Sequence, residues 1–219
     1  MKQKINPAQL LIESASIIFW DFDGVIKESL EIKTLAYESV FSSFGSAITE
    51  RVRDHHEKNS GVSRFEKIPL YLVWAGQHAS AEQVDEFCAR FSETVLKSVV
   101  NSPWVPGVKE YILKNFSRQD FVIVTATPQE EIEIILADLD LSHCFEHVYG
   151  APTKKADAIQ AVLFRLDCSP DRALMLGDAE VDLLSAEANG VPFVLRRNSH
   201  NLTMQVNRSL LMIDHLNFV

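Results

Sequence analysis

The chain has few of the features that mark secreted or membrane-spanning proteins. Only three of its 219 residues are cysteines, Cys88, Cys144 and Cys168, with no CxxC pair and no histidine at metal-ligand spacing. We therefore expect reduced thiols in a reducing compartment. No apolar segment is long enough to cross a membrane, and no small-residue cleavage site follows the short apolar run near the N-terminus. These absences predict a cytoplasmic protein.

Positive charge is also scarce, because 21 lysines and arginines stand against 30 aspartates and glutamates, a net charge of −9. Binding to nucleic acid or to an anionic membrane relies on clustered basic side chains, so we expect neither partner. The charge does not exclude a phosphorylated small molecule, since a bound metal ion can reverse the sign of one pocket. The expected partner is such a metabolite, bound by a monomer or small homo-oligomer.

Short apolar runs alternate with helical patterns over much of the chain, and hydrophobic residues make up 47% of it, enough for a sizeable core. Continuous apolar runs of this length are typical of strands buried on both faces. The expected strands are residues 16–20, 121–124, 147–149, 173–176 and 192–195, and residues 210–213 could form one more short element. Strands alternating with helices predict an α/β fold with a doubly wound parallel sheet.

One long segment, residues 27–102, interrupts this alternation with helical periodicity alone. Apolar residues recur at steps of three and four residues, first at Ile32, Leu35, Ala36 and Val40, and later from Val84 to Val95. The sequence therefore predicts two domains. Residues 1–26 and 103–219 form the α/β core, and residues 27–102 form an inserted all-helical cap.

Polar side chains stand where the expected strands end. Asp21 and Asp23 follow the first strand, Thr125 the second, and Asp178 the fourth. Ligands of open α/β sheets bind at the carboxyl ends of the strands. Four carboxylates, counting Asp182 four residues after Asp178, would repel one another strongly without a cation. Oxygen ligands without histidine or cysteine favour Mg²⁺, which also binds phosphate oxygens.

These residues resemble the motifs of the haloacid dehalogenase superfamily, and in particular its phosphoglycolate phosphatase and β-phosphoglucomutase-like subgroup with a helical cap. The segment from Asp21 to Val25 resembles the first motif, DxDx(T/V), and Thr125 matches the second. Lys155 matches the third motif, and Gly177-Asp178 with Asp182 matches the fourth, GDxxxD. The motifs occur in the family's order, and the resemblance covers nearly the whole chain.

The resemblance implies a Mg²⁺-dependent phosphatase that hydrolyses a small phosphorylated metabolite through an aspartyl-phosphate. Asp21 would be the nucleophile, Asp23 the general acid and base, and Lys155 the stabiliser of developing charge. Thr125, Ala126 and Lys155 would bind the phosphoryl group. Mg²⁺ would be held by Asp21, Asp178 and Asp182 together with the backbone carbonyl of Asp23. Family spacing favours Lys155 over its neighbour Lys154.

Two alternatives stay open. A phosphomutase of the β-phosphoglucomutase type would retain the same motifs and would need a bisphosphate activator. A binding protein on the same fold would have lost turnover, but the presence of Asp21 and Asp23 argues against it. Asp23 also favours phosphate esters, because the dehalogenases and phosphonate hydrolases of the superfamily lack an acid there.

A polar cluster lies within the helical insert. It comprises His55, His56, Asn59, Ser60, Gly61, Arg64 and Lys67. One interpretation is a specificity loop that closes over the active site, and the other is a solvated loop between helices. Within it we choose Arg64 as a substrate ligand, because a guanidinium suits a second phosphate or a carboxylate. Residues 24–27 and 103–107 join the insert to the core, and we expect them to act as hinges for closure.

Overall fold

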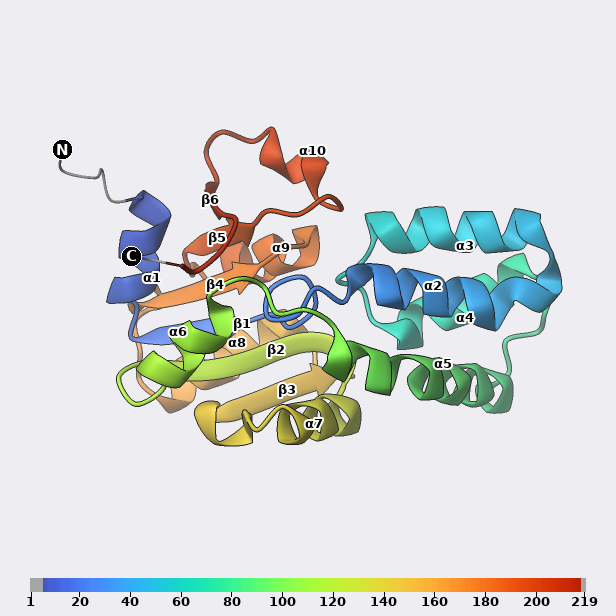
Figure 1. Cartoon of the computed structure of the whole chain (residues 1–219), viewed down its shortest axis with the longest axis horizontal. Coiled ribbons are helices and arrows are strands. Elements are labelled where there is room, and N and C mark those ends of the chain that lie inside the picture. Colours follow the sequence, from blue (N-terminus) through green and yellow to red (C-terminus); the bar gives the residue numbers. More distant parts are fainter. Residues whose placement is uncertain (1–5, 218–219) are drawn as a thin grey trace.

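The computed structural model describes residues 6–217, and a six-stranded parallel sheet forms its centre (Figure 1). The strands are β1 (Ile17–Trp20), β2 (Asp120–Pro128), β3 (His147–Ala151), β4 (Ala173–Gly177), β5 (Phe193–Arg196) and β6 (Leu211–Ile213). Their order is β3-β2-β1-β4-β5-β6, and every neighbouring pair is parallel. This is the doubly wound arrangement, so the predicted fold class is confirmed. The short element expected at residues 210–213 is the edge strand β6.

Alternate residues of the central strand face opposite layers of helices. Ile18 and Trp20 pack in a cluster with α1 (Pro7–Ser14), α6 (Val108–Asn115) and α7 (Gln129–Asp138). Ile17 and Phe19 pack in a second cluster with α8 (Lys155–Arg165) and α9 (Glu180–Ala188). Both faces of the sheet are thus covered, which explains why the strands read as uninterrupted apolar runs.

Four helices stand beyond the carboxyl edge of the sheet: α2 (Leu30–Phe41), α3 (Ser46–Lys58), α4 (Arg64–Trp74) and α5 (Ala81–Asn101) (Figure 1). A short 3₁₀ turn, Ser42–Phe44, follows α2. Buried aromatic rings join these helices, with Tyr37 of α2 lying 5.5 Å from Tyr71 and 4.2 Å from Phe91 between ring centroids. The apolar stripe expected on α2 was wrong at Leu35, which is 52% exposed, because Tyr37 and Phe41 fill the buried face instead.

The two chain segments that connect these helices to the sheet lie side by side. The backbone N–H of Glu28 donates to Pro103 O (2.9 Å), and that of Val105 donates to Ile26 O (3.0 Å). Lys27 is buried between them. Its Nζ donates to the carbonyl of Val100 (3.0 Å) and lies 4.3 Å from the ring centroid of Trp104. Any movement of the helical insert must therefore bend both segments together.

The remaining elements are α10 (Leu202–Gln205) and the 3₁₀ turns Ser142–Cys144 and Pro170–Arg172. All three cysteines are free thiols. Within residues 6–217, none of the helices has the length and apolar character that crossing a membrane requires.

Candidate active site

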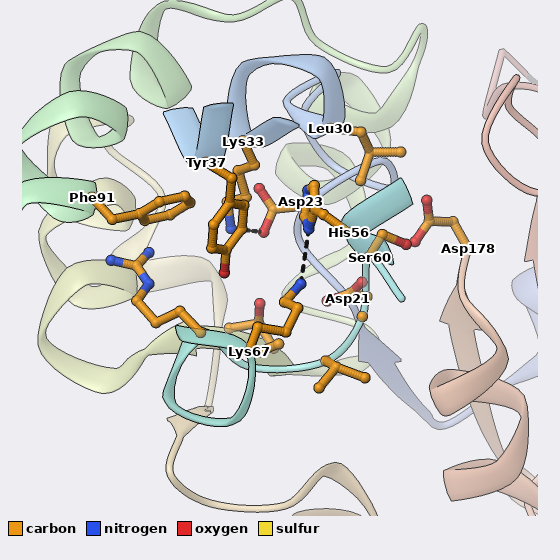
Figure 2. Close-up of a pocket in the computed structure, with 15 residues that line it drawn as sticks. Asp21, Asp23, Leu30, Lys33, Tyr37, His56, Ser60, Lys67, Phe91 and Asp178 are labelled. Carbon is orange, nitrogen blue, oxygen red and sulfur yellow. Dashed lines mark hydrogen bonds and ion pairs between the residues drawn. The ribbon is translucent and has the colours of Figure 1, made fainter. Parts of the chain in front are cut away.

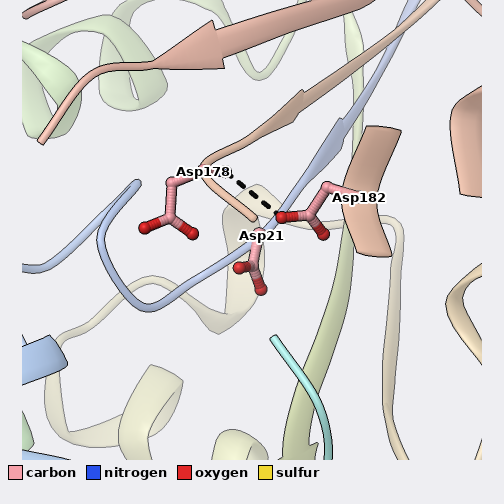
Figure 3. Close-up of side chains that lie close together, drawn as sticks. All are labelled: Asp21, Asp178 and Asp182. Carbon is pink, nitrogen blue, oxygen red and sulfur yellow. Dashed lines mark hydrogen bonds between the residues drawn. The ribbon is translucent and has the colours of Figure 1, made fainter. Parts of the chain in front are cut away.

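Three carboxylates meet at the carboxyl edge of the sheet (Figure 3). Asp21 follows β1, Asp178 follows β4, and Asp182 lies in the first turn of α9. Their side chains each offer an oxygen within 4.8 Å of the others, and all three residues are buried. The parallel register of β1 with β4 brings together residues that are far apart in the sequence.

Lys155, the first residue of α8, is the cation that reaches this cluster. Its Nζ lies 2.9 Å from Asp21 Oδ1 and 2.5 Å from Asp182 Oδ1. The neighbouring Lys154 is exposed to solvent. The other oxygen of Asp182 accepts hydrogen bonds from the backbone N–H groups of Asp178 (3.2 Å) and Ala179 (3.0 Å). Asp182 therefore orients Lys155 and the turn after β4.

The single positive charge of Lys155 does not balance the negative charges of three buried carboxylates. Burial raises the pKa of Asp21 to about 7, and Asp182 and Asp23 add to this effect while Lys155 opposes it. Burial, Asp21 and Asp182 also raise the pKa of Asp178 well above its usual value. For Lys155, burial favours the neutral form, but Asp182 and Asp21 raise the pKa above its ordinary value. The donor set, oxygen atoms with a net negative charge, fits a hard divalent cation such as Mg²⁺.

A glycine leaves room beside this cluster. A Cβ on Gly24 would lie 2.3 Å from Asp178 Oδ2, and the residue has a positive φ of 77°. The fourth residue of the first motif therefore has to be small for the turn after β1 to approach Asp178.

The carboxylate of Asp23 has partners of its own. Ser29 Oγ donates to Oδ1 (2.6 Å), Thr127 Oγ1 donates to Oδ2 (3.1 Å), and Lys33 of α2 forms an ion pair with Oδ2. Burial alone would raise the pKa of Asp23, but Lys33 and the hydroxyl donors lower it below the usual value. The sequence prediction missed all three partners.

The position of Lys33 in the sequence could have indicated that its side chain faces the site. It lies in the first turn of the helix that follows the first motif, one turn before the buried Tyr37. A helix residue on the same side as a buried neighbour is a candidate to face the site. Thr127 had a weaker signal as the second threonine at the end of β2, where Thr125 Oγ1 accepts a hydrogen bond from its backbone N–H (3.2 Å).

A cavity of about 20 Å³, room for roughly one water molecule, lies between the carboxylates and the helical insert. Figure 2 shows Tyr37, His56, Lys67 and Phe91, all from the helical insert, around the carboxylates of Asp21 and Asp23. Thr125 and Ala126 also line this cavity. A groove of about 540 Å³ shares Ser60 to Val62 and Asp178 with it.

Four of the seven residues in the polar cluster of the insert are helical, and three of them are buried. His55 and His56 lie in α3, Arg64 and Lys67 lie in α4, and His56, Arg64 and Lys67 are at most 4% exposed. The solvated-loop alternative is therefore wrong for these three residues. The short loop between α3 and α4 contacts the core, because a Cβ on Gly61 would lie 2.4 Å from Val181 Cγ1.

Arg64 contacts the core of the protein through its guanidinium group. Nη1 and Nη2 bind the two oxygens of Glu131 of α7 at 2.9 and 2.7 Å, and Nη1 also donates to Ser92 Oγ (2.6 Å). Arg64 lines the cavity, as expected for a substrate ligand, but its donors are engaged by protein groups. Glu131 was not singled out from the sequence.

A further polar residue follows β5. Asn198 Nδ2 donates to Asp178 Oδ2 (2.6 Å), and this contact lowers the pKa of Asp178 against the effects described above. Asn201 Nδ2 binds the backbone carbonyl of Asp178 (2.8 Å). Both asparagines follow a parallel strand at the same sheet edge as Asp178, a signal that the sequence prediction did not use.

Known proteins match this chain in sequence and in structure. The model of the family described as haloacid dehalogenase-like hydrolase matches residues 17–195. A phosphorylated carbohydrates phosphatase of Thermotoga maritima is 26% identical over 80% of this chain and 81% of its own length. Phosphoglycolate phosphatase 1 of Pseudomonas aeruginosa is 27% identical over 80% of this chain and 66% of its own length.

A solved structure shares the fold. It is a mutant form of CbbY from Rhodobacter sphaeroides in complex with xylulose-(1,5)bisphosphate. It superposes with a TM-score of 0.74 at 16% identity, and the match covers 92% of this chain and 95% of the CbbY chain.

Proposed function

This chain belongs to the haloacid dehalogenase-like hydrolases and is a phosphomonoesterase, and we propose that it hydrolyses a small phosphorylated metabolite by Mg²⁺-dependent transfer of the phosphoryl group to Asp21. One observation carries this proposal. Asp21 lies at the carboxyl end of the central strand, next to both a lysine and two further carboxylates. A carboxylate nucleophile beside a cation-binding cluster suits attack on a phosphate ester.

In the first half-reaction, an Asp21 oxygen attacks phosphorus while the bond from phosphorus to the ester oxygen breaks. Asp23 gives its proton to that departing oxygen. Lys155 stabilises the negative charge on Asp21 and on the phosphoryl oxygens, and Thr125 and Ala126 bind those oxygens at the end of β2. The product is an aspartyl-phosphate together with the free alcohol.

In the second half-reaction, Asp23 takes a proton from a water molecule that attacks the aspartyl-phosphate. The bond to Asp21 breaks, and inorganic phosphate leaves with the carboxylate restored. The contact of Asp23 with Lys33 supports this role, because it favours the ionised carboxylate that accepts the proton.

Mg²⁺ would be held by Asp21, Asp178 and the backbone carbonyl of Asp23, with Asp182 nearby. When bound, it supplies positive charge that offsets the repulsion between the nucleophile and the phosphate. Both side-chain oxygens of Asp182 already bind Lys155 and backbone N–H groups. A carboxylate has about four acceptor sites, so Asp182 can also bind the ion, directly or through a water molecule.

We propose further that residues 27–102 act as a mobile cap, with residues 24–27 and 103–107 as hinges. The cavity holds about one water molecule, so a phosphorylated metabolite needs more room than this closed arrangement offers. Opening would separate the loop between α3 and α4 from α9 and widen the neighbouring groove. Closure then limits the water that can reach the aspartyl-phosphate.

The test is phosphate release from a panel of phosphorylated metabolites with Mg²⁺ and with a chelator, for the wild type and Asp21→Asn. We expect release that requires Mg²⁺ and falls by at least roughly 10³-fold in the variant, as for loss of other nucleophiles. Undiminished release by Asp21→Asn would refute the assigned nucleophile. Isomerisation of a sugar phosphate with a bisphosphate primer, without net phosphate release, would favour the phosphomutase alternative. The cytoplasmic location and the oligomeric state stay predictions.

A further inference from the structure

The segment after β5, residues 197–205, contacts the carboxylate cluster at Asp178. Asn198 Nδ2 donates to Asp178 Oδ2 (2.6 Å), and Asn201 Nδ2 donates to the backbone carbonyl of Asp178 (2.8 Å). The backbone N–H of Asp178 donates to Asp182 Oδ2 (3.2 Å). Asp178 is thus held at its backbone from two directions, and its carboxylate is held by Asn198.

The amide of Asn198 is itself oriented by its neighbours. An ionised carboxylate only accepts hydrogen bonds, so it must meet the NH₂ end of an amide. Asn198 Oδ1 accepts from the backbone N–H of His200 (2.8 Å), which directs Nδ2 toward Asp178. The backbone N–H of Asn198 donates to Asn201 Oδ1 (3.1 Å), and Gln205 Nε2 donates to Asn198 O and to Asn201 Oδ1 (2.7 Å each). The segment therefore holds a donor in a fixed place beside the carboxylate.

The segment is anchored where β5 ends. Asn201 is 5% exposed, and its Nδ2 also donates to the backbone carbonyl of Arg196, the last residue of β5 (2.8 Å). Arg196 is buried and forms an ion pair with Glu28, just before α2, with Nη1 donating to Oε2 at 3.0 Å. Strands β4 and β5 are neighbours, so the segment and Asp178 start from adjacent strand ends. A donor fixed in this way loses little conformational freedom when an ion binds nearby.

We propose that Asn198 is a positioning residue of the metal site, which holds the Asp178 carboxylate in the orientation that binds Mg²⁺. Groups that hydrogen-bond to the ligands of a metal orient those ligands, and their loss commonly lowers metal affinity by roughly 10- to 100-fold. A carboxylate has about four acceptor sites, so the bond from Asn198 leaves others for the ion. This inference rests on the proposed function and adds to the Mg²⁺ site a residue that lies outside the four sequence motifs.

The test is titration calorimetry of Mg²⁺ binding to the wild type and to Asn198→Ala. We expect the Kd to rise by roughly 10- to 100-fold in the variant. Asn207→Ala is the matched control, because Asn207 is an exposed asparagine soon after the same segment, and its Oδ1 accepts from the backbone N–H and Oγ of Ser209 (3.1 and 2.7 Å). It should bind Mg²⁺ as the wild type does. Equal Kd values for Asn198→Ala and the wild type, or no Mg²⁺ binding by the wild type, would overturn the inference.

A second variant separates positioning from a general loosening of the segment. Gln205→Ala removes two hydrogen bonds within the segment but keeps the donors of Asn198 and Asn201 to Asp178. Its Mg²⁺ affinity should therefore fall less than that of Asn198→Ala, even if its denaturation midpoint, measured with a chelator, falls by as much. An equal or larger loss of affinity in Gln205→Ala would overturn the role of Asn198.

Phosphate release over a range of Mg²⁺ concentrations gives a further readout. Because Asn198 acts through the metal ligand, the Mg²⁺ concentration for half-maximal activity should rise in Asn198→Ala, while kcat at saturating Mg²⁺ should change much less. A fall in kcat with an unchanged half-saturating concentration would contradict the inference. If the wild type binds Mg²⁺ but releases phosphate from no metabolite, the proposed function fails, and the calorimetric comparison still decides the role of Asn198.

Discussion

Arg64 of α4 and Glu131 of α7 form a bidentate ion pair that links the helical insert to a helix packed on the sheet. The paired side chains are only 3% and 7% exposed, and the Arg64 guanidinium carbon lies 4.4 Å from the ring centroid of Phe91. The guanidinium on α4 and the carboxylate on α7 are both buried, and each would lose its partner if these two helices separated. The pair therefore favours the closed arrangement.

Glu131→Gln should weaken this contact while leaving α7 intact. Loss of one partner of a buried pair costs about 3–5 kcal/mol, because the remaining charge stays buried or must reach water. We expect a lower denaturation midpoint and faster proteolysis between the domains. Glu130→Gln, at an exposed position one residue earlier in α7, is the control. Equal behaviour of the two variants would show that the pair does not hold the insert to the core.

Lys33→Met should shift the pH dependence of turnover. Lys33 lowers the pKa of Asp23 against the effect of burial, so its removal raises that pKa. A general acid must be protonated, and a higher pKa keeps it protonated at higher pH. The alkaline limb of the kcat profile should therefore move upward in pH, with Lys97→Met, at an exposed position of α5, as the control. A profile that keeps its alkaline limb in place would argue against Asp23 as the acid.

Affinity for Mg²⁺ should fall as the pH is lowered through 7. The pKa of Asp21 is raised to about 7 by burial and by Asp182 and Asp23, so a proton competes with the cation below that pH. Competition by one proton predicts an affinity roughly tenfold lower at pH 6 than at pH 8. Titration calorimetry of the wild type at the two pH values measures this ratio. A pH-independent affinity would place Asp21 outside the metal site.

Gly24→Ala should weaken Mg²⁺ binding and lower activity by more than a general loss of folding stability would explain. Its Cβ would meet Asp178 Oδ2 at 2.3 Å. Gly45→Ala is a matched control, because Gly45 also has a positive φ, 89°, but nothing lies within 4 Å of its added Cβ. Both substitutions place an alanine at a positive φ, which costs about 1–3 kcal/mol of backbone strain. Only Gly24→Ala should weaken Mg²⁺ binding measured by calorimetry, and equal affinities in the two variants would contradict the account.

Local patterns predicted the fold because they follow from backbone geometry. The buried run before Asp21 had to be a strand covered on both faces, and the run before Asp178 likewise. Parallel strands bring such residues to one sheet edge, so the neighbourhood of Asp21, Thr125, Lys155 and Asp178 could be expected. The prediction that Leu35 lies on the buried face of α2 was wrong. Helical periodicity does not say which of two apolar faces meets the neighbouring helices.

The sequence by itself determined the α/β class, the helical insert and the carboxylates that gather with Lys155. The reason is that residues directly after parallel strands meet at the same edge of the sheet. Only the tertiary structure decided which partners these groups meet across the insert. The pairing of Lys33 with Asp23 and the pairing of Glu131 with Arg64 depend on how the insert is seated on the sheet domain. That placement is set by long-range packing, which no local spacing encodes.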